Sequence, residues 1–299
     1  MTSKQKILVI LGPTATGKSD LAVEIALRYN GEIISADSRQ VYKGMDLGTG
    51  KITKKEMYGV PHYMLDIVNP NSIYNVAKYK AKAGKIILNI IKRGKLPIIC
   101  GGTGFYIDSV VKNISLPDVP PNQKLRNKLE KESCEKLMKQ LEKLDPRISK
   151  TIDSKNKIKI IRAIEIAKKL GKVPVVKSKP IYNAIQIGLV ASDKVLRERI
   201  IIRLKRRMKA GMLDEVKKLH RQGVGWERME VLGLEYRYMA RHLSGKISLE
   251  QMIIELNSKI WQFARRQKTW FKRNKDIKWF EVGGKTNKKI TGYLKKITL

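Results

Sequence analysis

Cysteine, histidine and long apolar runs are scarce in this sequence of 299 residues. The two cysteines, Cys100 and Cys134, lie far apart and the three histidines do not cluster, which excludes a metal site built on closely spaced thiolates or imidazoles. So few cysteines are typical of a reducing compartment, and we expect a cytoplasmic location. The longest apolar runs, such as Ile7–Leu11, are much too short to cross a bilayer. We therefore expect neither a membrane anchor nor a signal peptide.

Acidic residues are also few. Lys and Arg number 63 against 27 Asp and Glu, which gives a net charge of +36, and residues 151–299 carry more of this excess than residues 1–150. Such a charge repels itself unless a polyanion neutralises it, so a nucleic acid is the expected partner. A solvated, lysine-rich surface that reflects a biased composition is the alternative.

A glycine-rich segment follows the apolar run Ile7–Leu11 and precedes a helical pattern. It fits the spacing G-x-x-x-x-G-K-[ST] of a phosphate-binding loop (P-loop), and its eight residues are expected to bind a phosphate or pyrophosphate: Gly12, Pro13, Thr14, Ala15, Thr16, Gly17, Lys18 and Ser19. The glycines let successive backbone N–H groups point at one anion. Lys18 adds a positive charge, and Ser19 offers a hydroxyl to a divalent metal. The anion would lie at a helix N-terminus, which favours negative charge.

Short apolar runs alternate with helical patterns through the first hundred residues and return after residue 180. We expect strands over residues 7–11, 32–36, 96–100 and 184–191, and helices over residues 20–29 and 76–93. This alternation predicts an α/β fold of the P-loop NTPase type, with a parallel sheet and helices on both faces. Ligands bind such sheets at the carboxyl ends of the strands, where Gly12–Ser19, Asp37-Ser38 and Gly101–Gly104 would converge.

A proline-rich segment, Leu116–Pro121, interrupts the α/β pattern, and residues 122–171 read as several charged helices. We expect residues 117–180 to form a helical insertion. Residues 1–116 and 181–299 would form the α/β core, with basic helices toward the C-terminus and one long helix over Val195–Arg221.

Asp37 is the first candidate for chemistry outside the P-loop. It follows the strand expected over residues 32–36, which we expect to lie beside the P-loop strand, and from there it could bind a metal or accept a proton. A helix cap or turn is the structural alternative. An ATPase normally has a second apolar strand that ends in a magnesium-binding Asp, but the strand over 96–100 ends in glycines. This difference argues against nucleotide hydrolysis and favours a pyrophosphate that leaves as a product.

Two basic segments lie in the last third of the chain. Arg199, Arg203 and Arg206 are spaced to share one helix face, which either is solvated or places one guanidinium on a pyrophosphate. The segment Trp261–Arg273 interleaves aromatic rings with five cations. Its cations are expected to contact RNA, and its rings are not expected to stack on bases. A core position for Phe263, Trp270 and Phe271, with only the cations outside, is the alternative that stays open.

Together these segments resemble the tRNA dimethylallyltransferase (isopentenyl-tRNA transferase) family. The resemblance runs from about residue 6 to residue 275, and it is carried by Gly12–Ser19, Ile34–Thr49, Gly59–Asp66, Gly101–Tyr106, Arg162–Glu165 and Ala264–Trp270. The pair of the Gly-Pro-Thr-Ala-x-Gly-Lys and Asp-Ser-x-Gln-x-Tyr motifs is far more specific than a P-loop alone.

The resemblance implies transfer of a dimethylallyl group from dimethylallyl diphosphate to N6 of the adenosine 3′-adjacent to the anticodon, giving N6-isopentenyladenosine and pyrophosphate. It implies that Thr14, Lys18 and Arg203 stabilise the departing pyrophosphate, and that Ser19 and Asp37 hold Mg²⁺. Asp37 would also accept the proton from the adenine amine. The residues that the resemblance places against tRNA are Asp37, Ser38, Arg39, Gln40, Thr103, Arg126, Ile158, Lys159, Ile160, Ile161 and Arg162.

The partners implied are the anticodon stem-loop of tRNA and dimethylallyl diphosphate, with no membrane. We expect a monomer, because the pattern shows no spare apolar surface. Three alternatives stay open: a prenyltransferase of free adenine nucleotides, a small-molecule or nucleotide kinase, and a non-catalytic RNA-binding protein. The large basic insertion argues against the first, and each of the other two leaves part of the motif set unexplained.

Overall fold

The computed structural model describes residues 4–297 of the chain. The chain divides into two compact units, each described by itself below. One contains the residues up to Asn113 and those from Pro180 onward, and the other contains Ile114–Lys179.

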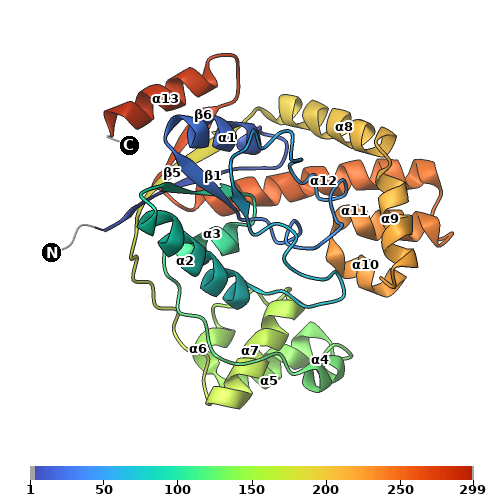
Figure 1. The fold of residues 1–299 in the computed structure, drawn as a ribbon. Helices are drawn as coiled ribbons and strands as arrows, with labels where there is room; N and C mark the ends of the chain where they lie inside the picture. Colours follow the sequence, from blue (N-terminus) through green and yellow to red (C-terminus); the bar gives the residue numbers. More distant parts are fainter. Residues whose placement is uncertain (1–3, 298–299) are drawn as a thin grey trace. The chain divides into compact units, whose positions relative to one another are not determined.

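A six-stranded, all-parallel sheet forms the centre of the first unit (Figure 1), which confirms the predicted fold class. Its strands, in the order β3-β2-β4-β1-β5-β6 across the sheet, are β3 (His62–Tyr63), β2 (Gly31–Ser35), β4 (Leu96–Gly101), β1 (Lys6–Leu11), β5 (Asn183–Val190) and β6 (Ile277–Glu281). The expectation that the strand before Asp37 lies beside the P-loop strand was wrong, because β4 pairs with both β1 and β2. Strands β3 and β6 were not predicted.

Helices cover both faces of this sheet (Figure 1), as predicted. Helices α1 (Lys18–Arg28) and α13 (Thr286–Lys296) pack on one face through side chains such as Ile25 and Leu294. Helices α2 (Val76–Lys92) and α3 (Gly104–Val111) pack on the other, where the rings of Tyr79 and Tyr106 stack with their centroids 4.1 Å apart. The strands read as near-continuous apolar runs because both of their faces are buried.

Five further helices form a second layer of the first unit. They are α8 (Asp193–Lys209), α9 (Met212–Arg221), α10 (Trp226–Leu232), α11 (Leu234–Leu243) and α12 (Leu249–Lys272). Their apolar faces share one buried cluster with Val41, Tyr42 and Met45, so the segment after Asp37 is anchored in a helical core. The single helix predicted over Val195–Arg221 was wrong, because Gly211 adopts φ +94° and separates α8 from α9.

The second unit is helical and has its own core. It contains α4 (Gln123–Leu129), α5 (Cys134–Leu144), α6 (Pro146–Ser149) and α7 (Lys157–Leu170). Leu137, Leu141, Ile160 and Ile164 are fully buried in its centre. Asn122, Ser133, Asp145 and Asn156 each cap the N-terminus of the helix that follows them with a side-chain oxygen.

Across residues 4–297, each helix is too short or too polar to span a bilayer.

Two glycine-to-alanine substitutions should change stability in opposite directions. A Cβ atom at Gly101 would lie 2.3 Å from the carbonyl oxygen of Ala36, so Gly101→Ala forces β2 and β4 apart and should lower the free energy of unfolding by about 1–3 kcal/mol. A Cβ at Gly84, inside α2, meets nothing within 4 Å, so Gly84→Ala should raise the free energy of unfolding by about 0.5–1 kcal/mol. Urea unfolding measures the free energy of unfolding of both variants. Equal changes in that free energy would contradict the close approach at Gly101.

Candidate active site

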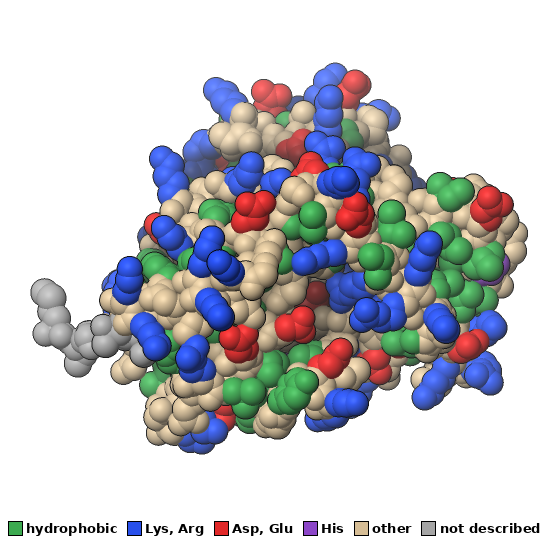
Figure 2. Space-filling view, turned by 90° about the horizontal axis from the view of Figure 1, so that it is seen from above, with side chains coloured by type: hydrophobic (Ala, Val, Ile, Leu, Met, Phe, Trp, Pro, Cys, Tyr) green, Lys and Arg blue, Asp and Glu red, His purple; other side chains and the backbone are tan. Residues whose placement is uncertain are grey.

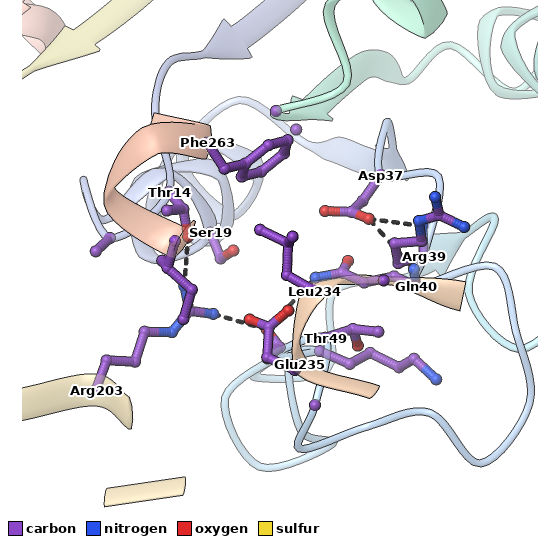
Figure 3. Close-up of a pocket in the computed structure, with 18 of the residues that line it drawn as sticks. Thr14, Ser19, Asp37, Arg39, Gln40, Thr49, Arg203, Leu234, Glu235 and Phe263 are labelled. Atoms are coloured by element: carbon purple, nitrogen blue, oxygen red, sulfur yellow. Dashed lines mark hydrogen bonds between the residues drawn. The ribbon is translucent and has the colours of Figure 1, made fainter. Parts of the chain in front are cut away.

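A cavity of about 1030 Å³ lies at the carboxyl ends of β1, β2 and β4. Its floor is the P-loop after β1, the Asp37 segment after β2 and the Gly101–Gly104 segment after β4. Residues from α8, α11 and α12 complete the wall, and Figure 3 shows Thr14, Asp37, Arg203 and Phe263 around the hollow. The predicted convergence of three strand ends on one crevice is therefore present in the structure.

The P-loop has the backbone conformation that an anion-binding loop needs. Gly12, Ala15 and Gly17 have φ values of +142°, +62° and +81°, and such positive values curl the backbone as an anion-binding loop requires. A Cβ atom at Gly12 would lie 2.4 Å from the carbonyl oxygen of Leu189 on β5, so only glycine fits there. The hydroxyl of Thr16 donates to the Pro13 carbonyl at 2.9 Å and closes the turn. Gly17 then leads directly into α1.

Lys18 lies inside the loop and makes no ion pair with any of residues 4–297. Its ammonium donates to the Pro13 carbonyl at 2.6 Å. Burial of that ammonium, with a smaller contribution from the charge of Arg203, lowers the pKa of Lys18 to about 8. A bound anion would favour the charged form, so the site is poised to accept a phosphate.

Arg203 reaches the P-loop from α8. Its guanidinium donates to the Thr14 hydroxyl at 3.0 Å and to the Gly50 carbonyl at 3.1 Å. Burial lowers its pKa from the usual value, with the charge of Arg207 as the next cause. Arg199 and Arg206 also line the cavity, as the helical spacing predicted. The cavity therefore gathers several guanidinium groups around the loop.

Asp37 lies directly beyond the end of β2, and backbone groups orient its carboxylate. One oxygen, Oδ1, accepts from the backbone N–H groups of Arg39 (2.8 Å) and Gln40 (3.3 Å), as the dashed lines in Figure 3 show. Among the described residues the other oxygen has no hydrogen bond, and the residue lines the cavity. This is the arrangement of a carboxylate that is fixed in direction and free to accept a proton.

The residues around Asp37 are tied to other segments. The Ser38 N–H donates to the Thr103 hydroxyl at 3.0 Å, which joins the loops after β2 and β4. The Gln40 amide accepts from the Ser35 hydroxyl and donates weakly to the Gly50 carbonyl at 3.4 Å. Arg39 donates to the Val231 carbonyl at 2.9 Å. All of these predicted site residues line the same cavity.

The wall formed by residues 46–50 is held by two residues that the sequence did not reveal. The carboxylate of Glu215, on α9, accepts from the backbone N–H groups of Asp46, Leu47 and Gly48 at 2.7–2.9 Å. Tyr236 donates its hydroxyl to the same carboxylate at 2.6 Å. Because about 170 residues separate Glu215 from this loop, no local sequence signal could have found the contact.

The aromatic side chains of the segment Trp261–Arg273 differ in burial along α12. Phe271 is buried in the core, which confirms the alternative of a core position for this ring. Phe263 and Trp270 are 39% and 36% exposed and line the cavity, so the core alternative does not hold for these two rings. Gln267, from the same segment, is buried and bridges the loops after β1 and β4.

In the helical unit, two residues that are expected to contact RNA, Arg126 and Arg162, also form ion pairs within the protein. Arg126 and Arg162 are both bound to Glu165, leaving about a third of each side chain exposed. Burial alone would raise the pKa of Glu165, but the bonds from Arg126, the backbone of Asn122 and Arg162 hold it at about 2.

The side chains of Ile160 and Ile161 lie in the core of the helical unit, so the prediction that they contact RNA was wrong for these side chains. The apolar period of α7 could have shown this, because Ile160, Ile161 and Ile164 share one face of the helix. Ile158, which is 76% exposed, and Lys159 remain on the surface.

The charge excess is visible on the surface. On the face in Figure 2, Lys and Arg side chains outnumber acidic ones and gather at the edge of a hollow. Within residues 4–297, no three His, Cys, Asp or Glu side chains are grouped to hold a metal. A divalent cation here would need oxygen ligands from a substrate in addition to those of the protein.

The sequence matches the IPP transferase family over residues 40–274. A tRNA dimethylallyltransferase 1 from Geotalea daltonii is 45% identical over 268 residues, which cover 89% of this chain and 86% of that protein. A tRNA dimethylallyltransferase 2 from Treponema denticola is 44% identical over 280 residues, with 91% and 93% of the two chains covered.

Solved structures agree with these relatives. The full-length tRNA isopentenylpyrophosphate transferase from Bacillus halodurans superposes with a TM-score of 0.75 at 37% identity, covering 98% of this chain and 96% of that one. A eukaryotic dimethylallyltransferase that acts on tRNA gives a TM-score of 0.83 at 26% identity, covering 96% and 77%. The P-loop, the Asp37 carboxylate and these similarities agree, and the chain belongs to the tRNA dimethylallyltransferase (IPP transferase) family.

Proposed function

We propose that this protein transfers the dimethylallyl group of dimethylallyl diphosphate to N6 of the adenosine 3′-adjacent to the anticodon of tRNA. One observation carries the proposal: a single cavity holds both a P-loop with a buried lysine that makes no ion pair and an oriented carboxylate, Asp37. The first is suited to a diphosphate leaving group, and the second to the proton of an attacking amine.

The P-loop would hold the diphosphate of the prenyl donor. Residues 15–19 lead into the N-terminus of α1 and would offer the diphosphate their backbone N–H groups, and Lys18 supplies a charge that the diphosphate would stabilise. The Arg203 guanidinium donates to the Thr14 hydroxyl and would stabilise the negative charge that develops on the bridging oxygen of the diphosphate. Thr14, Lys18 and Arg203 therefore act on the leaving group.

Mg²⁺ fits this site through Ser19. The Ser19 hydroxyl lies beside Lys18 at the start of α1 and lines the cavity, whereas an all-protein cage is lacking among residues 4–297. Mg²⁺ commonly takes its remaining ligands from water and substrate phosphates. When bound, it would neutralise part of the diphosphate charge. Asp37 lines the same cavity, and we propose that its carboxylate helps to hold the ion as well as accepting the proton.

The target adenine of the tRNA would enter the same cavity. An amine within a stacked loop cannot reach an allylic carbon in a pocket, so the base must leave the stack. The segment Asp37–Gln40 and Thr103 line the cavity and present the polar groups that would contact the flipped base. Because the Ser38 and Thr103 contact fixes these two segments together, the base would meet a rigid surface.

The reaction follows from this placement. The N6 lone pair forms a bond to C1 of the allyl group while the C1–O bond breaks, and its electron pair leaves with the pyrophosphate. The nitrogen then loses a proton to the free oxygen of Asp37. The backbone N–H groups on the other oxygen of Asp37 would keep the carboxylate in place, and Arg203 would stabilise the departing diphosphate.

In the helical unit, we propose that Ile158 and Lys159 contact the anticodon stem-loop at the start of α7. Both side chains are exposed, and Lys159 adds a positive charge. The exposed thirds of Arg126 and Arg162 would contact phosphates while Glu165 keeps them in place. Since the cavity is built from one chain, we also propose that the protein acts as a monomer, in the cytoplasm where its substrate is found.

Mass spectrometry tests the proposed function directly. The protein is incubated with dimethylallyl diphosphate, Mg²⁺ and an anticodon stem-loop that has adenosine 3′-adjacent to the anticodon, and the same stem-loop with guanosine there is the control. We expect the mass of one dimethylallyl group on the first RNA and none on the second. Prenylation of AMP in place of the stem-loop, or consumption of ATP with no prenylation, would replace the proposal with one of its alternatives.

Asp37→Asn should separate catalysis from binding. The amide cannot accept the proton but keeps the size of the side chain, so we expect the single-turnover rate to fall by about 10²- to 10⁴-fold. The affinity for the stem-loop should stay close to that of the parent. Rapid-quench kinetics and a binding titration measure the two quantities, and an unchanged rate would remove Asp37 as the base.

Lys159→Ala should weaken stem-loop binding in a salt-dependent way. Loss of one phosphate contact lowers the slope of log K against log salt by about 1. Lys169→Ala, an exposed lysine at the other end of α7, is the matched control and should leave the slope unchanged. Titrations at several salt concentrations measure both slopes, and equal slopes for the two variants would contradict an RNA contact at Lys159.

A further inference from the structure

Gln267, on α12, bridges two loops of the cavity. Its side-chain oxygen accepts from the Thr14 backbone N–H at 2.9 Å, and its side-chain nitrogen donates to the Gly102 carbonyl at 2.9 Å. The residue is only 7% exposed. It lies 253 residues from Thr14 and 165 residues from Gly102, so one buried amide connects the P-loop to the loop after β4.

The chemistry of the two contacts requires an amide. Thr14 offers a donor and Gly102 offers an acceptor, and a flipped amide would set N–H against N–H and oxygen against oxygen. A carboxylate cannot donate to Gly102, and a lysine or arginine cannot accept from Thr14. Methionine has similar length but can make neither bond. Among common side chains of this length, glutamine alone satisfies both loops.

The bridge continues to the proposed base. Thr103, next to Gly102, accepts from the Ser38 N–H through its hydroxyl and donates its own N–H to the Ala36 carbonyl. Ala36 and Ser38 flank Asp37, so a continuous series of contacts runs from the P-loop through Gln267 to the carboxylate. Thr14 is held on its other side by Arg203.

We infer that Gln267 is a positioning residue that sets the distance between the diphosphate half and the adenine half of the site. The inference rests on the proposed function, because it assigns the two loops to the two substrates. Neither substrate needs to touch Gln267. Its amide holds each loop against α12, and in doing so it places the allylic carbon within reach of N6.

This role has a distinct kinetic signature. Loss of a residue that binds one substrate raises the KM of that substrate, whereas loss of a residue that sets the separation of two bound substrates lowers the rate at saturation. A misplacement of about 1 Å can cost about 10²-fold in rate. Gln267→Met should therefore lower the single-turnover rate at saturating substrates by about 10- to 100-fold, with the KM of either substrate changed by less than about threefold.

Gly102→Ala supplies an independent variant. A Cβ atom at Gly102 would lie 2.2 Å from the side-chain nitrogen of Gln267, so the methyl group displaces the amide without changing residue 267. This variant should show the same loss of rate and the same small change in KM. Gln262→Met is the matched control, because Gln262 is an exposed glutamine on the same helix. It should behave like the parent protein.

The experiment measures single-turnover rate, both KM values and thermal unfolding for the parent and the three variants. A rate loss in Gln267→Met and Gly102→Ala, with KM values near those of the parent, supports the inference. Rates equal to that of Gln262→Met would overturn it, as would a rise in KM with an unchanged rate at saturation. If Gln267→Met does not fold, the single-turnover rate and KM values of Gly102→Ala decide whether the inference holds. A parent protein that transfers no prenyl group would instead refute the proposed function and this inference with it.

Discussion

Positive charge without an acidic partner is the feature on which the cavity depends. Lys18 and Arg203 make no ion pair among residues 4–297 and donate only to carbonyl and hydroxyl oxygens. Burial lowers the pKa of both groups, which means that the folded protein disfavours their charges until an anion arrives. Binding energy from a diphosphate is thus available at the point where its negative charge increases during the reaction.

The surrounding fold keeps this charge close to Asp37. Parallel strands bring their carboxyl ends to one edge, and β4 places the Gly101–Gly104 segment between the P-loop and the Asp37 segment. The close approach of Gly101 to Ala36 and the bridge through Gln267 leave these loops little freedom. Helices α8, α9 and α12 then supply the side chains that fix the opposite wall. Preorganisation of this kind is what a two-substrate transfer needs.

The sequence alone predicted those features that depend on the spacing of residues close together in the chain. The strand, P-loop and helix are contiguous, so residues 6–28 could be assigned to their roles by spacing. The strand order could not be predicted, because β4 inserts between β1 and β2 although it comes later in the chain. The contacts of Glu215 and Gln267 were missed because each joins segments more than 150 residues apart. Glu165 was visible in the sequence, but its burial between Arg126 and Arg162 was not.

The most direct test of the account is a crystal structure of the protein with an unreactive thio-analogue of dimethylallyl diphosphate and an anticodon stem-loop. The diphosphate is predicted to lie on the backbone N–H groups of residues 15–19, with Arg203 on its oxygens. N6 of the flipped adenosine is predicted to lie between the allylic carbon and the Asp37 carboxylate. A diphosphate bound outside the P-loop, or an adenosine whose N6 does not face Asp37, would contradict the account.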